Sequence, residues 1–456
     1  MSATRAVVVG GGIGGLASGV ALARAGWDVT VLERAPSLEP VGAGIAVAPN
    51  AVRALGALGL GDRLRNLSAL QGEVGLRRPD GRWLVRGNAT AASERFGDQT
   101  LVLHRAQLVD MLAEALPDGA LRLGADATVV DPGDAGRPAR VRVRTDVGPE
   151  AGGSRAVSRV EASSADGDLS PVGEPSLDGT PGGSEEIEAA LVVAADGIDS
   201  PTRRRWWPDA PAPVSGGSTA WRLVADAPPG ELVGGETWGR GIVVGIVPLA
   251  DGRVYSYVSV ADAAGVPASF DELRERLADW HAPIPDLLAS VDADHVLRHE
   301  LRQLPVPPAS LVSGRVALVG DAAHAMLPNV GQGGCQALED AVVLGVRMTD
   351  VADARTAAAS SASGASDGGA NLATVPALLR RWSDERRPRV VKVMRMSAQM
   401  AGMSRVVSPV VTTARDLGAR IAGPWSAALG AWALRGVLGW RPPEPGTVAT
   451  TFDDDA

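Results

Sequence analysis

Residues 7–15 read Val-Val-Val-Gly-Gly-Gly-Ile-Gly-Gly and continue an apolar run that predicts a β-strand at Arg5 to Val9. They contain the pattern G-x-G-x-x-G at Gly10, Gly12 and Gly15, and an alanine-rich segment that predicts a helix follows. In such a turn the first glycine permits the bend, the second lets a phosphate approach the backbone, and the third lets helix and strand pack closely. The stretch therefore predicts a dinucleotide-binding βαβ unit.

An acidic residue stands where this unit needs one. Glu33 ends the next predicted strand, Asp28 to Glu33, 18 residues after Gly15. A carboxylate there can accept hydrogen bonds from both ribose hydroxyls of an adenosine. The alternative is a glycine-rich turn beside an incidental surface glutamate, but triplet, strand, helix and acid together are a more specific signal than the triplet alone.

A second glycine-rich stretch, residues 317–335, reads Ala-Leu-Val-Gly-Asp-Ala-Ala-His-Ala-Met-Leu-Pro-Asn-Val-Gly-Gln-Gly-Gly-Cys. Asp321 follows a predicted strand, Arg315 to Val319, where its carboxylate can bond a sugar-alcohol hydroxyl. The glycines after Pro328 expose N–H groups at the start of a predicted helix, and a helix start favours negative charge. A reduced flavin develops such charge along its N1 and C2-carbonyl edge.

With these motifs the chain resembles the single-component FAD-dependent aromatic hydroxylases, the flavoprotein monooxygenases of the para-hydroxybenzoate, salicylate and urate hydroxylase kind. A third motif, Ala-Asp-Gly-Ile-Asp-Ser at residues 195–200, resembles the family's D-G motif, which is linked there to FAD and nicotinamide nucleotide. The three motifs stand in the family's order, and the resemblance covers nearly the whole chain apart from two low-complexity segments.

The resemblance implies the cofactor site. Arg105 corresponds to the family's arginine near the ribityl and pyrophosphate groups, although on the sequence alone a solvated helix residue is the better interpretation. The cofactor-binding residues that we expect are Gly10, Gly12, Ile13, Gly14, Gly15, Glu33, Arg34, Arg105, Asp196, Gly197, Gly320, Asp321, Gly331, Gln332, Gly333 and Gly334.

Candidates for the substrate site lie on predicted strands of a second domain. Alternation sends Trp221 and Arg222 to opposite faces, and we expect Arg222 to face the flavin, where a cation would keep a phenol or carboxylate ionised. Trp238 and Tyr255 are the other candidates to bind substrate, with ordinary packing as the alternative for each.

His324 and Pro328 join Arg222 as candidate catalytic residues, with a supporting role near the cofactor favoured for His324 over proton transfer. His281, His295 and His299 are expected to be surface residues, and Cys335 a buried packing residue. No spacing of histidines and cysteines indicates a metal site.

The pattern along the chain predicts an α/β fold, with a Rossmann-like FAD-binding domain, a discontinuous, sheet-rich substrate domain and C-terminal helices. The expected boundaries are 1–75, 97–205 and 305–350 for the FAD-binding domain, 76–96 and 206–304 for the substrate domain, 353–372 for a flexible linker, and 373–456 for the helical region. We expect amphipathic helices kinked at Pro388 in the last region.

Residues 146–185 are dominated by glycine, proline and serine and carry eight acidic residues against two arginines. Such a segment cannot bury enough apolar surface to offset its ordering entropy, so the sequence predicts a disordered acidic insertion in a hairpin loop.

Composition excludes several classes of protein. The 456 residues carry a net charge of −9, which disfavours nucleic acid as a partner, and a single cysteine excludes a disulfide framework and favours the cytoplasm. We expect no transmembrane segment, because Arg420, Pro424 and Arg435 break the longest apolar run. The first 25 residues imitate a signal peptide, but the five glycines between Gly10 and Gly15 fit a strand and turn better.

The resemblance implies a monooxygenase that uses FAD, NADH or NADPH, and O2 to hydroxylate an aromatic or other electron-rich ring through a flavin C4a-hydroperoxide. One alternative is a flavin-dependent epoxidase or reductase acting on an isoprenoid or polyketide. The other is a nicotinamide-binding dehydrogenase or binding module, which would leave the second glycine motif without a role. A small-molecule substrate and a monomer or homodimer are expected.

Overall fold

The computed structural model describes residues 4–38, 44–65, 72–145, 184–230, 232–360, 373–421 and 434–444. Its first sheet has the strand order β17-β18-β11-β1-β2-β7, and every neighbouring pair is parallel except β17 with β18. The strands are β1 (Arg5–Val9), β2 (Asp28–Leu32), β7 (Leu121–Arg122), β11 (Leu191–Ala194), β17 (Val312–Ser313) and β18 (Val316–Leu318). This is the predicted Rossmann-like arrangement.

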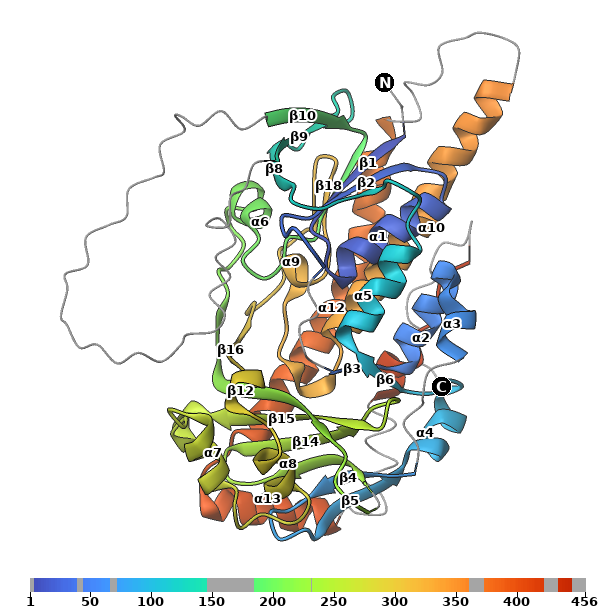
Figure 1. Cartoon of the computed structure of the whole chain (residues 1–456). Helices are drawn as coiled ribbons and strands as arrows, with labels where there is room; N and C mark the ends of the chain where they lie inside the picture. The colour runs from blue at the N-terminus through green and yellow to red at the C-terminus, as the bar shows by residue number, and fades with distance from the viewer. Residues whose placement is uncertain are drawn as a thin grey trace, which may run out of the picture.

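Helices cover this sheet, as a parallel sheet with two apolar faces requires. The covering helices include α1 (Ile13–Arg24), α5 (Arg105–Glu114) and α10 (Gly333–Ser360), which lie side by side in Figure 1. Helices α1 and α10 approach closely, because a Cβ at Gly345 would lie 2.9 Å from the Cβ of Ala21. The close approach brings the starts of both helices, and hence both glycine motifs, to one region.

A three-stranded sheet flanks the first, formed by β8 (Asp126–Asp131), β9 (Ala139–Arg144) and β10 (Ser184–Ala189). Strands β9 and β10 pair antiparallel from Ala139 with Ala189 to Arg144 with Ser184. The predicted acidic insertion lies outside the described residues except for its last two, 184 and 185, but the strands on either side pair as those of a hairpin do.

The second sheet has the order β16-β12-β15-β14-β13-β4-β5 and lies at the lower end of the molecule in Figure 1. Its strands are β4 (Glu73–Arg77), β5 (Trp83–Asn88), β12 (Val214–Asp226), β13 (Gly234–Trp238), β14 (Ile242–Pro248), β15 (Arg253–Ala261) and β16 (Leu297–Gln303). Two separate stretches of sequence thus build one sheet, since β4 pairs parallel with β13.

The two faces of the second sheet have different neighbours. One face packs on α7 (Phe270–Arg276) and α8 (Ile284–Ala289) in an apolar cluster of its own. The other turns toward the first domain, where Tyr255 packs with Val102 of β6 (Leu101–His104), the partner of β3 (Gly44–Val47). We call the first the helix face and the second the flavin face, because the sequence analysis expects the flavin on that side.

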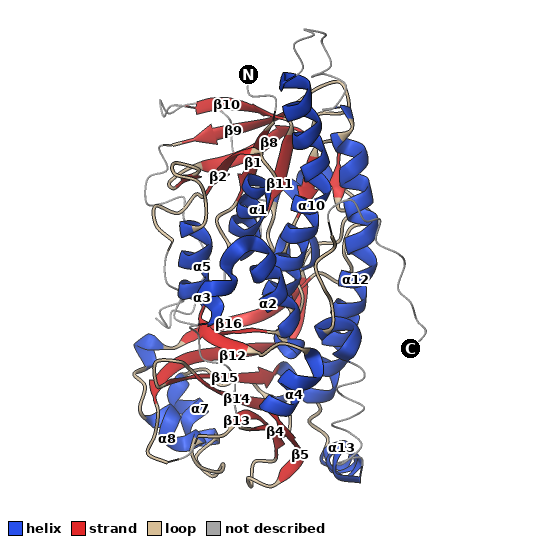
Figure 2. Cartoon of the chain, turned by 90° about the vertical axis from the view of Figure 1, so that its right-hand side faces the viewer, coloured by secondary structure: helices blue, strands red, loops and turns tan. Residues whose placement is uncertain are grey.

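Helix α12 (Val375–Ser404) runs alongside both sheet regions, next to α10 (Figure 2), and α13 (Pro409–Ile421) lies against the second sheet. The remaining helices are α2 (Pro49–Leu55), η1 (Gly56–Leu60), α3 (Gly61–Arg65), α4 (Ala89–Phe96), α6 (Pro201–Trp206), η2 (Asp262–Ala264), η3 (Ala293–His295), α9 (Asp321–His324) and η4 (Pro328–Val330). Among the described residues, no helix is long and apolar enough to cross a membrane.

Two sequence-based expectations need correction. The predicted linker at 353–372 begins inside α10, which continues to Ser360, and residues 361–372 lie outside the described part of the chain. Around Pro388 the structure has one helix, α12, rather than two. Pro388 is exposed, so the hydrogen bond that its missing N–H removes is lost at the surface.

Candidate active site

The first glycine turn has one crowded side and one open side. Gly10 has a φ of 106°, and a Cβ there would collide with the carbonyl oxygen of Ala195, whereas a Cβ at Gly15 would collide with that of Gly10. Gly12, at the N-cap of α1, has no atom of the described residues within 4 Å of a Cβ position. Gly10 and Gly15 therefore permit tight packing, and Gly12 leaves space at the positive end of the helix.

Glu33 is fixed against this turn. Its Oε2 accepts a hydrogen bond from the Gly11 N–H at 2.6 Å, and its Oε1 accepts one from the Ala35 N–H at 2.9 Å. Each oxygen keeps a further lone pair for a ligand hydroxyl. Arg34, beside it, is exposed.

Asp196 follows β11 and lies next to Gly10. Its Oδ2 accepts from the Thr202 N–H at 3.1 Å, but its Oδ1 is buried and has no hydrogen-bond partner among the described residues. Gly197 has a φ of 79° and open space around it. A buried acceptor without a partner destabilises a structure by about 1–3 kcal/mol, so this place favours a ligand that donates.

The second glycine motif also leaves space. Asp321 begins α9 with an exposed side chain for which the described residues provide no hydrogen bond. Gly331, with a φ of 62°, and Gly333, at the start of α10, have nothing within 4 Å of a Cβ position. Gln332 between them is buried, and its Oε1 accepts from Asn50 at 2.9 Å.

A buried charged network holds this motif from behind. Arg386 of α12 donates to Glu339 at 2.7 Å and to Asp340 at 2.8 Å, and Arg389 also bonds Glu339. Asp340 in turn accepts from the Gly320 N–H and lies 2.6 Å from Nε2 of His324. Burial tends to raise the pKa of Asp340, but the charges of His324 and Arg386 outweigh it and hold the pKa at about 2.

His324 is fully buried, and its Nδ1 has no partner among the described residues. This location fits the supporting role that the sequence favoured and not contact with substrate. Pro328 lies exposed in η4, between His324 and the open glycines. Cys335 is buried as expected, and burial raises the pKa of its thiol to about 12.

On the second sheet, Trp221 and Arg222 point to opposite faces. Trp221 is 1% exposed and belongs to the apolar cluster under α7 and α8, so the expectation that it binds substrate is corrected: it is a core residue on the helix face. Arg222 stands on the flavin face, where its cross-strand partner is Tyr257. Among the described residues, no carboxylate lies within ion-pair distance of its guanidinium.

Tyr255 and Trp238 also lie on the flavin face. The sequence analysis missed two further residues of this face, Glu236 and Tyr257. The Tyr257 hydroxyl donates a hydrogen bond to the Glu236 carboxylate, which also accepts one from Trp238 Nε1 at 2.7 Å. Burial raises the pKa of Glu236. The sequence did contain a signal for Tyr257, because the chain has two tyrosines and both stand at alternate positions of one strand, on the same face.

Two histidines expected at the surface are half-buried instead. Burial and the charge of Arg222 lower the pKa of His299, on β16, to about 4, so its imidazole is neutral at pH 7. His281 lies against Thr237 on the helix face, and burial lowers its pKa as well. His295 is exposed, as expected.

Strand β3 connects the glycine motifs with the flavin face. A Cβ at Gly334 would lie 3.3 Å from Ile45, and a Cβ at the neighbouring Gly44 would collide with the ring of Tyr255. Arg105, at the start of α5 after β6, is exposed, and no described residue forms a hydrogen bond or ion pair with it that would compete with a ligand.

These residues fit a flavin adenine dinucleotide. The chain offers open backbone at four glycines, an orphaned buried oxygen on Asp196 and two helix starts. A model of the FAD binding domain family matches residues 3–361. The chain belongs to this family. It is an FAD-dependent monooxygenase, as its curated relatives are.

Among those relatives, the aurachin C monooxygenase/isomerase of Stigmatella aurantiaca is 35% identical to this monooxygenase over 344 residues, 74% of this chain and 79% of the relative. The FAD-dependent urate hydroxylase of Klebsiella pneumoniae is 30% identical over 358 residues, 76% and 82% of the two chains. The solved structure of Klebsiella pneumoniae HpxO with FAD and uric acid superposes with a TM-score of 0.72 at 25% identity, covering 95% of this chain and 97% of that one.

The monooxygenase depends on Asp321 for flavin binding if its free carboxylate bonds the ribityl chain. A lost hydrogen bond of this kind is worth about 1–3 kcal/mol, so Asp321→Ala should raise the FAD dissociation constant on the order of tenfold. Fluorescence titration of apoprotein with FAD measures it. Asp384→Ala, at an exposed position of α12, is the matched control. An unchanged constant in Asp321→Ala would remove this residue from the site.

Proposed function

We propose that this monooxygenase uses NADH or NADPH and O2 to hydroxylate an electron-rich ring that carries an acidic O–H or N–H group. The observation that carries the proposal is the guanidinium of Arg222 on the flavin face, which has no carboxylate partner among the described residues and stands beside Tyr255 and the buried pair of Glu236 and Tyr257. A cation there favours the ionised form of the ring, and ionisation makes the ring carbon nucleophilic. The urate and 3-hydroxybenzoate hydroxylases among the relatives are named for rings of this kind.

The roles of the cofactor-binding residues follow from their positions. Glu33 would hold the adenosine ribose, and Gly12 with the start of α1 would hold the pyrophosphate. Asp196 and Asp321 would bond hydroxyls or N–H groups of FAD, and the α10 start at Gly331 to Gly334 would face the flavin's N1 edge. FAD, when bound, accepts hydride from the nicotinamide and passes one oxygen atom of O2 to the substrate.

The chain's own residues prepare the substrate. Arg222 would bind the anionic group and orient the ring, while Tyr255, Tyr257 and Trp238 supply an apolar wall that excludes water. The stoichiometry is ring–H + O2 + NAD(P)H + H⁺ → ring–OH + H2O + NAD(P)⁺. We place the enzyme in the cytoplasm, where NAD(P)H is supplied, as a monomer or homodimer.

A second candidate reaction is epoxidation without ring hydroxylation, and the relationship to the aurachin C monooxygenase/isomerase favours it. Both reactions are tested by NAD(P)H oxidation and O2 uptake with a panel of phenols, purines and quinolones, followed by mass spectrometry. A hydroxylated ring supports the main proposal, whereas an epoxide or rearranged product supports the second. No acceleration of NAD(P)H oxidation by any ring compound would contradict both.

Arg222→Met should raise the substrate KM at least tenfold and divert NAD(P)H oxidation toward H2O2, since one charge-assisted hydrogen bond is worth about 1.5–3 kcal/mol. FAD content should stay normal. Arg298→Met is the matched control, because Arg298 lies one strand away on the helix face, 5.4 Å over the Trp221 ring. Wild-type KM and coupling in Arg222→Met would show that Arg222 does not bind substrate.

A further inference from the structure

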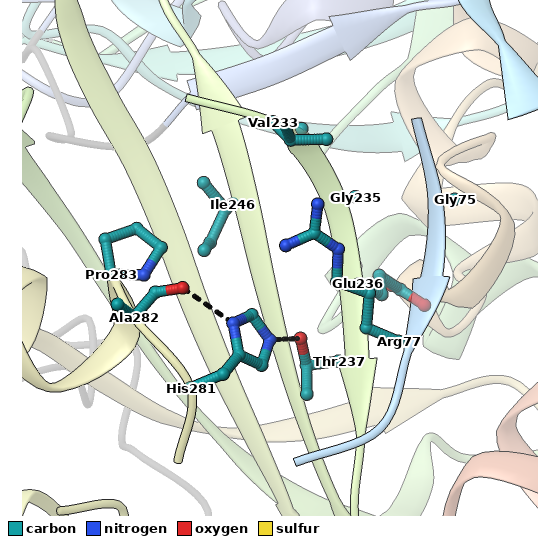
Figure 3. Close-up of a pocket in the computed structure, with 11 residues that line it drawn as sticks. Gly75, Arg77, Val233, Gly235, Glu236, Thr237, Ile246, His281, Ala282 and Pro283 are labelled. Atoms are coloured by element: carbon teal, nitrogen blue, oxygen red, sulfur yellow. Dashed lines mark hydrogen bonds between the residues drawn. The ribbon is translucent and has the colours of Figure 1, made fainter. Parts of the chain in front are cut away.

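The helix face of the second sheet carries a cavity of about 70 Å³ that is separate from the flavin face. It lies between β4, β13 and β14 and the loop before α8, and Figure 3 shows Arg77, Thr237 and His281 around it. Thr237 and Arg77 are paired residues of β13 and β4, so their side chains share this face. Arg222 and Tyr257 lie on the opposite side of the sheet.

Arg77 is the charged group of this cavity. Its guanidinium points toward the middle of the pocket in Figure 3, and it lies 4.1 Å over the ring of Trp83. Within the described part of the chain, no carboxylate forms an ion pair with it and no acceptor takes a hydrogen bond from it. Glu73, a nearby acid on β4, is paired with Arg86 instead. Burial lowers the pKa of Arg77, and the charge of Glu73 offsets this only in part.

The other polar side chains at the cavity already have hydrogen-bond partners. His281 Nδ1 donates to the Ala282 carbonyl at 2.7 Å, so its Nε2 accepts from the Thr237 hydroxyl at 2.9 Å and the ring is neutral. The carboxylate of Glu236 is occupied by Tyr257 and Trp238. Among the described residues that line the cavity, Arg77 is therefore the one arginine, and the one acid, Glu236, has its carboxyl on the other side of the sheet.

The remaining wall is apolar, formed by side chains such as Ile246, Val233 and Pro283. A planar guanidinium with free donors matches a carboxylate in a bidentate arrangement. A short hydrocarbon tail suits the apolar wall, which an inorganic phosphate would leave unused. The volume is too small for a nucleotide or a sugar phosphate.

We propose that this cavity is a second ligand site that binds a small aliphatic monocarboxylate through Arg77, with the alkyl tail against Ile246 and Pro283. The site does not depend on the function proposed for the flavin face. A bound ligand would contact β13, the strand whose other face carries Glu236.

The test is calorimetric titration of the FAD-loaded protein with sodium propionate at constant ionic strength, with sodium chloride as the blank. Saturable binding is expected in the wild type and in Arg82→Gln, an exposed arginine in the same β4–β5 hairpin. Arg77→Gln should weaken binding at least tenfold. Arg77→Lys keeps the charge but loses the bidentate donor geometry of the guanidinium, so it should weaken propionate binding less than Arg77→Gln does. It replaces Arg77→Gln in the test if that variant does not fold.

Three results would overturn the proposal. They are no saturable binding of propionate to the wild type, equal binding to wild type and Arg77→Gln, or binding of inorganic phosphate in place of propionate. The visible absorbance of bound FAD reports folding of each variant and is independent of the cavity.

Discussion

Gly12→Val should yield a folded protein that retains almost no FAD. Within the described part of the chain, no atom lies within 4 Å of the Cβ position of Gly12, so the new side chain has room in the apoprotein. The same space is where a pyrophosphate must approach the start of α1, and a valine there would exclude it. We expect FAD affinity to fall on the order of a hundredfold or more, because both the helix-end contacts and the close approach are lost.

The measurement is the FAD-to-protein ratio after purification, with circular dichroism to check the fold. Gly56→Val is the matched control, since Gly56 also has open space and lies in a helical segment with a φ of −59°. Full FAD occupancy in Gly12→Val would refute the assignment of the pyrophosphate site.

Arg386→Met should destabilise the protein by about 3–5 kcal/mol, the usual effect of removing one partner of a buried ion pair. Arg386 is 1% exposed and bonds Glu339 and Asp340, which are fully buried. Without it two carboxylates lose a compensating charge in the interior. Because Asp340 also binds the Gly320 N–H and His324, weaker FAD binding should accompany the loss of stability.

Urea unfolding of the FAD-free protein measures this effect without a contribution from ligand binding. Arg381→Met, at an exposed position of the same helix, should change the free energy of unfolding by less than about 0.5 kcal/mol. A loss below about 1 kcal/mol in Arg386→Met would show that the buried network is not a structural support of the second glycine motif.

The sequence predicted the elements that local pattern controls. Strand β1 is found at Arg5–Val9 as predicted, and the glycine turn leads into α1 as the motif requires. Alternation placed Trp221 and Arg222 on opposite faces because strand periodicity is local. The family resemblance supplied the FAD site, and the open space at Gly12 and Gly331 agrees with it.

The features that the sequence analysis missed depend on long-range contacts. Glu339 and Arg386 lie 47 residues apart in the sequence, on different helices, and each alone resembles a solvated surface charge. The pair of Glu236 and Tyr257 needs the register of β13, β14 and β15, which no local pattern gives. At residues 353–360, alanine favours helix where the small-residue composition had indicated a linker.

The most direct test of the proposed function is turnover of the FAD-loaded enzyme under ¹⁸O2 with a ring substrate and NADH or NADPH. We expect one labelled oxygen in the hydroxylated ring for each nicotinamide oxidised, less the fraction lost as H2O2. A hydroxylated product without label, or nicotinamide oxidation that yields only H2O2 with every ring compound that accelerates it, would contradict the account.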